Sequence, residues 1–290
     1  MNQNKIEALG RAPARIELAR FPGGRRVALT TSFDDGHVYD RRIVEAFNAW
    51  GLKGTFNLNS AFLARDGIQV SGGGLEHIDA SEVCGLYAGH EVASHTCTHP
   101  HLTQLDSAQI ALEVLTDRQA LEDLVGYAVR GFAYPFGAHD ARVMDCLRAL
   151  GLTYARTCVG SDNCFPPQDP MAWGATAHQF GSEQNMIQRF DQCCADPYFY
   201  GAIHLWGHGF EFERRNDWAA LDRIYKPLSG RSEVWYCTNL QLFDYEAARQ
   251  RVVIAANRRT AFNPSANPVT LRVDGKLLEL SPGATMQFGG

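Results

Sequence analysis

The chain has 290 residues, of which 45% are hydrophobic and 20% are charged. These values are typical of a soluble globular protein, and the length allows one large domain or one domain with an appendage. The net charge of −5 and the isoelectric point near 6.1 provide no basic surface. Nucleic acid and anionic membranes are therefore not expected as partners, whereas a homo-oligomer stays open.

The start of the chain and its cysteines suggest a compartment. Residues 1–20 lack the apolar core of a signal peptide. No run approaches the roughly 18 apolar residues of a membrane-spanning helix. The eight cysteines include no CxxC pair, which favours reduced thiols in a chain without an export signal. These features lead us to expect a cytoplasmic protein.

Strand and helix patterns alternate over most of the chain. The predicted strands are residues 26–33, 54–58, 90–93, 129–134, 154–156, 199–205 and 233–238, and the predicted helices are 41–50, 81–88, 106–124, 140–150 and 218–225. Ser81 is the expected N-cap of the second helix, and Asp106 or Ser107 caps the third. Such alternation predicts a mostly parallel sheet or an α/β barrel. In both folds active sites form just beyond the ends of the strands.

The pattern changes after about residue 251. Short strands at 252–256, 269–273 and 277–280 are separated by Asn263-Pro264 and Asp274-Gly275 turns. The expected organisation has three parts, which are an N-terminal extension packed on the barrel (1–25), a barrel domain (26–250) and a small C-terminal β appendage (251–290).

Two polar motifs follow predicted strands and carry the clearest chemistry. Asp34-Asp35-Gly36 comes directly after the first strand, and His95 and His99 follow the third. Asp-Asp-Gly alone is common turn chemistry, and two histidines four residues apart can occur by chance. Together they supply an Asp-His-His ligand set, which leaves zinc an open position for water. The sequence therefore predicts one divalent metal ion, with zinc favoured.

Four motifs in order resemble those of the polysaccharide deacetylases of the NodB-homology type, also called carbohydrate esterase family 4. They are Ser32-Phe33-Asp34-Asp35-Gly36, Ser94-His95-Thr96-Cys97-Thr98-His99, Ala133-Tyr134-Pro135-Phe136-Gly137 and Trp206-Gly207-His208. The first two are specific in combination, whereas the last two are weak alone. The resemblance covers roughly residues 26–244. It implies a distorted (β/α) barrel and metal-dependent hydrolysis of an acetyl group.

The resemblance also implies a division of roles. Asp34 would be the general base, and His208 would be the general acid. The metal ligands would be Asp35, His95 and His99, and the ion would polarise the acyl oxygen. His204 competes with His208 for the acid role, because it lies four positions earlier on the same side of the strand.

Substrate contacts are expected around the third and last motifs. Backbone N–H groups near Phe136, just after Pro135, would stabilise the oxyanion. Trp206 would form a wall of the acyl pocket, and the aromatic side chains suit stacking on a sugar face. His37, which follows Asp35-Gly36, is expected at the rim of the site.

Two departures from the family pattern stand out. The third motif usually carries an arginine that braces the catalytic aspartate, but this chain has Ala133 there. Arg130, the nearest arginine, lies three positions earlier and is expected on the other strand face, so Asp34 is predicted to lack its brace. The aspartate-rich fourth motif has only loose counterparts, Asp162 and the segment 169–173.

Three functions are compatible with these motifs. The main hypothesis is a deacetylase acting on an N- or O-acetylated sugar or oligosaccharide. Relatives on the same barrel hydrolyse other C–N bonds, such as those of ureides or cyclic imides, and loss of the bracing arginine would be compatible with that activity. The third hypothesis is a catalytically silent sugar-binding domain, against which Asp34 argues because metal binding alone does not need it.

Overall fold

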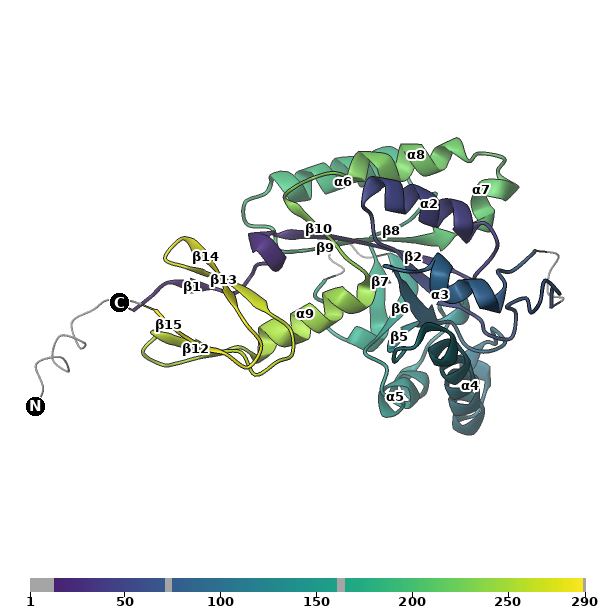
Figure 1. The fold of residues 1–290 in the computed structure, drawn as a ribbon, viewed down its shortest axis with the longest axis horizontal. Coiled ribbons are helices and arrows are strands. Elements are labelled where there is room, and N and C mark those ends of the chain that lie inside the picture. Colours follow the sequence, from purple (N-terminus) through teal and green to yellow (C-terminus); the bar gives the residue numbers. More distant parts are fainter. Residues whose placement is uncertain (1–12, 71–74, 161–164, 289–290) are drawn as a thin grey trace, which may run out of the picture. The chain divides into compact units, whose positions relative to one another are not determined.

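The computed structural model describes residues 13–70, 75–160 and 165–288 (Figure 1). The chain forms two compact units. The larger unit is residues 27–243, and it contains all the candidate site residues. The smaller unit combines the residues before 27 with those after 243. No helix in the described ranges has the length and apolar character needed to cross a membrane.

Parallel strands build the larger unit. They are β2 (Val27–Asp34), β3 (Thr55–Leu58), β4 (Glu91–Ser94), β5 (Gly131–Ala133), β6 (Tyr154–Gly160), β7 (Trp173–Ala175), β8 (Ala177–His178), β9 (Gly201–His208) and β10 (Val234–Tyr236). Their order is β7-β6-β5-β4-β3-β2-β9-β8, and β10 also pairs with β2. Only Thr176 separates the two edge strands β7 and β8 along the chain. The sheet is therefore a nearly closed, distorted α/β barrel, as the sequence predicted.

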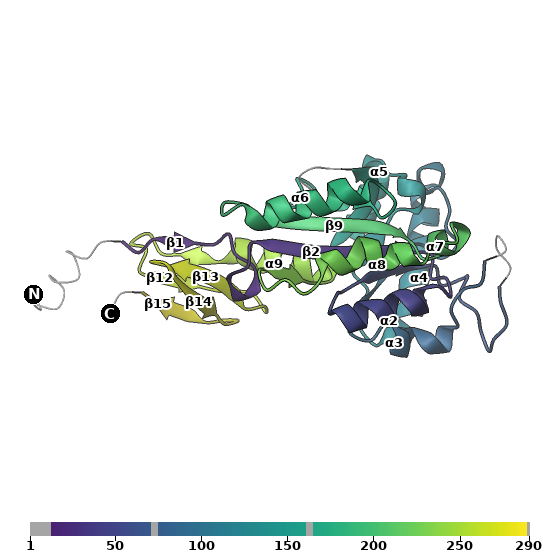
Figure 2. The ribbon, with the colours of Figure 1, turned by 90° about the horizontal axis from the view of Figure 1, so that it is seen from above.

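Helices follow most of these strands (Figure 2). They are α2 (Asp40–Trp50), α3 (Val83–Leu86), α4 (Ser107–Val125), α5 (Ala141–Ala149), α6 (Glu183–Ala195), α7 (Phe210–Arg214), α8 (Ala219–Tyr225) and α9 (Asn239–Arg251), with 3-10 turns η1 (Pro22–Gly24), η2 (Ala80–Glu82), η3 (Leu102–Gln104), η4 (Pro135–Gly137), η5 (Pro170–Ala172) and η6 (Lys226–Leu228). Asp106 caps α4 in a reciprocal capping box with Gln109. The segment predicted as one helix from Ser81 begins instead as η2, with Asp79 as its cap.

Strand β2 carries the first candidate residues, and all eight of its residues are buried. It pairs in parallel with β3 on one side and β9 on the other. The register places Asp34 level with Asn57 of β3 and His208 of β9. Parallel pairing thus brings three polar residues that are far apart in sequence into one row at the carboxyl edge of the strands.

Apolar side chains between the sheet and its helices hold β2 in this position. Phe33 packs against Phe47 and Phe56, with ring centroids 5.6 Å apart in each pair. All three rings are fully buried. Burial of each such side chain contributes about 1.5–3 kcal/mol, so the strand end that carries Asp34 and Asp35 is rigidly anchored.

The smaller unit consists of short antiparallel strands. They are β1 (Ile16–Glu17), β11 (Val253–Ile254), β12 (Thr260–Phe262), β13 (Val269–Val273), β14 (Lys276–Leu280) and β15 (Thr285–Gln287). The sequence suggested that residues 1–25 pack on the barrel. In their described part, however, β1 pairs with β13 and so joins the C-terminal strands. The Tyr245 hydroxyl also donates to the Arg20 carbonyl at 2.7 Å.

Candidate metal and acid–base site

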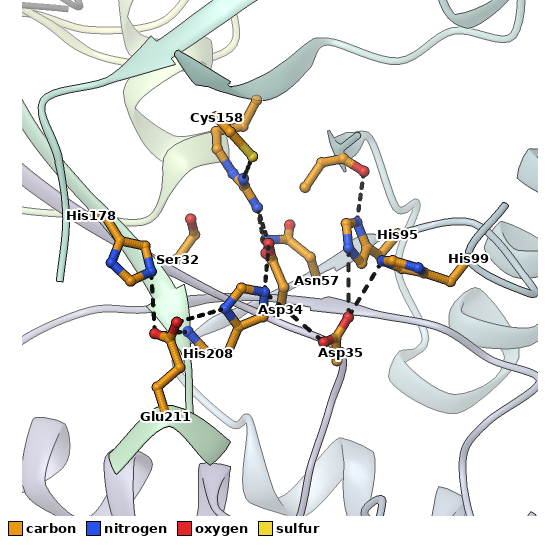
Figure 3. Close-up of polar contacts among 12 residues, drawn as sticks. Ser32, Asp34, Asp35, Asn57, His95, His99, Cys158, His178, His208 and Glu211 are labelled. Atoms are coloured by element: carbon orange, nitrogen blue, oxygen red, sulfur yellow. Dashed lines mark hydrogen bonds and ion pairs between the residues drawn. The ribbon is translucent and has the colours of Figure 1, made fainter. Parts of the chain in front are cut away.

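Asp34 lies at the end of β2 in a polar and almost closed environment (Figure 3). It is 2% exposed. The Asn57 side-chain amide donates to its Oδ1 at 2.8 Å, and the Arg156 guanidinium contacts both carboxylate oxygens. His208 Nε2 lies 4.0 Å from Asp34 Oδ2. The carboxylate is therefore held by an amide and a cation and faces one imidazole.

The prediction that Asp34 lacks a bracing arginine is wrong. Arg156 comes from β6, and its Cα is the register partner of Ala133 on β5. The chain thus carries the guanidinium one strand further along the barrel and at the same level. Burial by itself raises the pKa of Asp34, but Arg156 and the nearby imidazoles outweigh it and hold that pKa below its usual range.

Asp35 turns away from Asp34 and faces two histidines. Its φ of 79° lies in the left-handed region, which breaks the strand and redirects the side chain. Asp35 Oδ1 lies 3.7 Å from Nε2 of His95 and 3.7 Å from Nε2 of His99. The three ligand atoms lie within 4.8 Å of one another. This is the Asp-His-His group that the sequence predicted would come together.

His95 is oriented for metal binding by a backbone contact. Its Nδ1 lies 2.7 Å from the Ala133 carbonyl oxygen, so Nδ1 carries the proton and Nε2 keeps its lone pair toward Asp35. Outer-shell contacts of this kind fix the tautomer of ligating histidines. Burial lowers the pKa of His99 to about 4, which keeps it neutral, as a metal ligand must be. The residues therefore fit one divalent ion with an open position.

His208 has its own carboxylate, which the sequence did not reveal. Glu211 Oε1 lies 3.6 Å from His208 Nδ1, and Glu211 Oε2 lies 3.2 Å from His178 Nε2. Burial alone lowers the pKa of His208, but Glu211 and the aspartates of the site raise it above its ordinary value. Glu211 follows His208 by three residues at the start of α7. This spacing of three residues is the sequence signal that could have identified Glu211.

The other candidate acid, His204, belongs to the barrel interior. It is fully buried, and its ring nitrogens contact the hydroxyls of Thr30 at 2.7 Å and Ser32 at 3.3 Å. Burial holds the pKa of His204 well below its ordinary value. Its geometry is that of a neutral structural group, whereas His208 reaches the carboxylates.

The loose counterparts of the fourth motif lie elsewhere. Asp169 caps η5 and pairs with Arg148 on the surface. Trp173 is fully buried, with its ring centroid 4.2 Å from that of His204. Asp162 lies outside the described residues. In the described ranges, Glu211 is the carboxylate that partners His208.

The Pro135-Phe136 turn borders the metal group. Phe136 has a φ of 59°, and its side chain is 58% exposed. Its ring stacks on His101 at 3.9 Å and meets the edge of His99 at 4.5 Å. Pro135 is buried beneath the turn. The turn therefore presents an aromatic face beside a metal ligand.

Trp206 lies on β9, two residues before His208. The Arg156 guanidinium carbon is 4.7 Å from its ring centroid, a cation–π contact. The His178 ring meets it edge-on at 4.7 Å. Trp206 thus buttresses the arginine that holds Asp34.

Comparison with known proteins agrees with this geometry. The family model described as polysaccharide deacetylase matches residues 11–155, half of the chain. The chain belongs to the polysaccharide deacetylase family. Chitin deacetylase 1 of Cryptococcus neoformans is 33% identical over 66 residues, and the chitin deacetylase of Amylomyces rouxii is 33% identical over 69. These matches cover 23% and 24% of this chain but only 14% and 16% of the relatives.

Solved structures support the fold of this deacetylase family member. A Mycobacterium smegmatis protein, provisionally described as a polysaccharide deacetylase, matches 83% of this chain and 95% of its own, with a TM-score of 0.57 and 18% identity. The Xyl-CE4 domain of a multidomain xylanase from the hindgut metagenome of Trinervitermes trinervoides matches 77% and 92%, with a TM-score of 0.50 and 18% identity. At these identities the likeness concerns the barrel alone.

Proposed function

We propose that this protein is a metal-dependent deacetylase that hydrolyses an acetyl group from an N- or O-acetylated sugar or oligosaccharide. One observation carries the proposal, namely that two adjacent carboxylates contact different kinds of side chain. Asp35 Oδ1 lies 3.7 Å from Nε2 of both His95 and His99, whereas Asp34 is held by Arg156 and faces His208. Such a pair can separate metal binding from proton transfer. Membership of the family supports an acetylated saccharide as the substrate.

The ion would be held by Asp35, His95 and His99, and this nitrogen-rich ligand set favours zinc. A divalent ion bound there polarises an acyl oxygen and acidifies water. The chain's part is to aim both imidazoles at one point. The contact with the Ala133 carbonyl orients the ring of His95, and burial lowers the pKa of His99 to about 4, which keeps that imidazole neutral.

Asp34 would act as the general base. Its lowered pKa keeps it ionised at neutral pH, so it can take a proton from the attacking water. The oxygen of that water forms a bond to the acyl carbon, and the bond from that carbon to the sugar nitrogen or oxygen breaks. Arg156 keeps the carboxylate in place and Asn57 occupies one lone pair of Oδ1, which leaves Oδ2 toward His208.

His208 would act as the general acid. Its raised pKa favours the protonated ring, and Nε2 lies 4.0 Å from both Asp34 Oδ2 and Asp35 Oδ2. The proton goes to the leaving amine or hydroxyl of the sugar. Glu211 lies 3.6 Å from Nδ1 and raises the pKa of His208, which favours the charged form.

The turn at Phe136 would stabilise the oxyanion. Within this turn the N–H groups of Gly137 and Ala138 donate to backbone carbonyls, and Pro135 has no N–H. The Phe136 N–H is therefore the candidate donor to the acyl oxygen. The exposed Phe136 ring, stacked on His101, offers a flat apolar surface for a sugar ring.

Acetate release tests the proposal directly. Purified protein is loaded with zinc, its metal content is measured, and it is incubated with N-acetylated and O-acetylated sugars and with an aryl acetate. We expect acetate from at least one acetylated saccharide. Ammonia or ring opening from ureides or cyclic imides, without acetate, would instead favour the alternative hydrolase. Saccharide binding with no hydrolysis of any substrate would favour the silent binding domain.

A further inference from the structure

A pocket of about 260 Å³ opens beside the candidate metal ligands. It is lined by Asp35, His37, Phe62, Leu75, His77, His99, Phe210 and Arg214. Two of these residues, Asp35 and His99, belong to the candidate metal group. Ligand pockets commonly measure about 300–1,000 Å³. This one is somewhat smaller than that range, so it suits one sugar unit or one substituent, and it borders two of the candidate metal ligands.

One wall of the pocket is a pair of neighbouring imidazoles. The rings of His37 and His77 lie 4.4 Å apart, and His77 is only 3% exposed. Burial lowers the pKa of His77 to about 4, so its ring is neutral. His77 Nδ1 is buried without a hydrogen-bond partner among the described residues.

A cation stands at the outer edge of the same pocket. Arg214 ends the short helix α7, and its guanidinium carbon lies 4.4 Å above the Phe210 ring. Nearby acids are engaged with other groups. Glu213 accepts from the Trp218 indole at 2.8 Å, and Glu211 binds His178 and His208. Within the ranges that the structure describes, Arg214 has no carboxylate partner of its own.

An anion that reaches this edge would meet a planar donor held flat against an aromatic ring. A guanidinium binds a carboxylate through two parallel hydrogen bonds, which gives orientation as well as affinity. Phe62 and Phe210 would cover the apolar ring of the same ligand. The pocket thus combines an apolar wall, a wall of two imidazoles and one cation that has no carboxylate partner in the described ranges.

We infer that this pocket selects acidic saccharides, and that it binds a sugar carboxylate through Arg214 while the acetyl group lies at the metal group. The inference rests on the proposed deacetylase function and adds a substrate class to it. Arg214 is then a specificity residue, and the His37–His77 wall is the polar surface on which the same sugar lies.

Matched sugars test this inference. The probes are the methyl glycoside of N-acetylglucosamine, its C6-carboxylate form, and its 3-O-carboxyethyl form. Dissociation constants are measured by calorimetry on the zinc-loaded full chain, and acetate release is measured in parallel. The variants are Arg214→Gln and Arg215→Gln. Arg215 is the matched control, because it stacks in the same way on Phe180, at 4.2 Å and outside the pocket.

We expect the wild-type protein to bind at least one acidic sugar about tenfold more tightly than the neutral one, as one charge-assisted contact allows. Arg214→Gln should remove this preference, whereas Arg215→Gln should keep it. Equal binding of all three sugars, or a preference that survives Arg214→Gln, would overturn the inference. Binding reports on the pocket even if no acetate is released, so failure of the deacetylase proposal is a separate outcome.

Discussion

The metal side and the base side of the site begin at neighbouring residues but are built differently. On the metal side, Asp35 lies 3.7 Å from both histidine nitrogens, and His95 and His99 come from one loop after β4. On the base side, Asp34 is held by residues of β3 and β6 and faces one of β9. The two histidines of the metal group are thus close in sequence, whereas the partners of Asp34 are brought together by the strand register of the barrel. The following changes break one side at a time.

Loss of a metal ligand should have the largest effect. His95→Ala removes one of the three ligands that the structure brings together, and it leaves the Ala133 carbonyl without its donor. We expect the variant to lose bound zinc and all measurable deacetylation. Elemental analysis and acetate release check this outcome. Chelation of the wild-type protein should abolish activity in the same way, and added zinc should restore it.

Removal of Arg156 should affect both activity and stability. Arg156→Met leaves a buried carboxylate without its cation, which costs about 3–5 kcal/mol of unfolding free energy. The pKa of Asp34 should rise, because Arg156 is the main group that lowers it. The base must be ionised, so the acid limb of the kcat/KM profile should move to higher pH, with about a hundredfold loss near neutrality.

Two further variants sharpen this result. Arg130→Met is the matched control, because Arg130 bonds the Thr153 hydroxyl. The double variant Ala133→Arg/Arg156→Ala should recover part of the activity that Arg156→Ala loses, since residues 133 and 156 are register partners. An unchanged pH profile in Arg156→Met would show that Asp34 is not the base.

Glu211→Gln should weaken the acid without disturbing the metal group. Glu211 raises the pKa of His208, so its neutralisation should lower that pKa. The acid must be protonated, and the alkaline limb of kcat/KM should therefore move to lower pH. We expect about a tenfold loss at pH 8 and little change near pH 6. Glu213→Gln, which alters only the contact to Trp218, should keep the wild-type profile.

Another buried carboxylate is expected to affect stability rather than activity, and it gives a useful contrast. Asp40 accepts from the Tyr87 hydroxyl at 2.8 Å, and burial raises its pKa to about 8. The folded state therefore binds a proton that the unfolded state releases above about pH 4. Its contribution to stability is complete below pH 4 and is lost as the pH rises toward 8, at up to about 1.4 kcal/mol per pH unit.

Asp40→Asn removes this titration. Urea denaturation at pH 6, 7 and 8 should show a smaller fall in unfolding free energy for the variant than for the wild-type protein. Both Asp40 and Asp34 are buried, but only Asp34 contacts an arginine. Comparing them therefore shows how the arginine changes the pKa of a buried carboxylate. Equal slopes for the two proteins would mean that Asp40 is already ionised in the folded state.

The sequence predicted the barrel and the metal group because both rest on local patterns. Strand and helix signals alternate, and the ligands Asp35, His95 and His99 each follow a buried strand. Arg156 could not be found in this way, because its relation to Asp34 depends on the register of β5 with β6. The same holds for Glu211, whose approach to His208 depends on how α7 turns back after β9.

Two of the longer helices, α6 and α9, were missed for a different reason. In α6, Met186, Phe190 and Cys193 recur at helical spacing and are buried, with Ser182 as the cap. The signal was present but polar residues dominate the segment. No helix was predicted after residue 239, although the structure has α9 there. This helix shows no strongly apolar stripe and is stabilised by its tertiary surroundings.

The division of labour between Asp34 and Asp35 is tested most directly by the metal content of Asp34→Asn and Asp35→Asn, measured beside acetate release. Both variants should lose turnover, Asp34 as the base and Asp35 as a ligand. Asp34→Asn should retain one equivalent of zinc, as in the wild-type protein, whereas Asp35→Asn should lose it. Wild-type turnover in Asp34→Asn, or loss of zinc from both variants alike, would contradict the account.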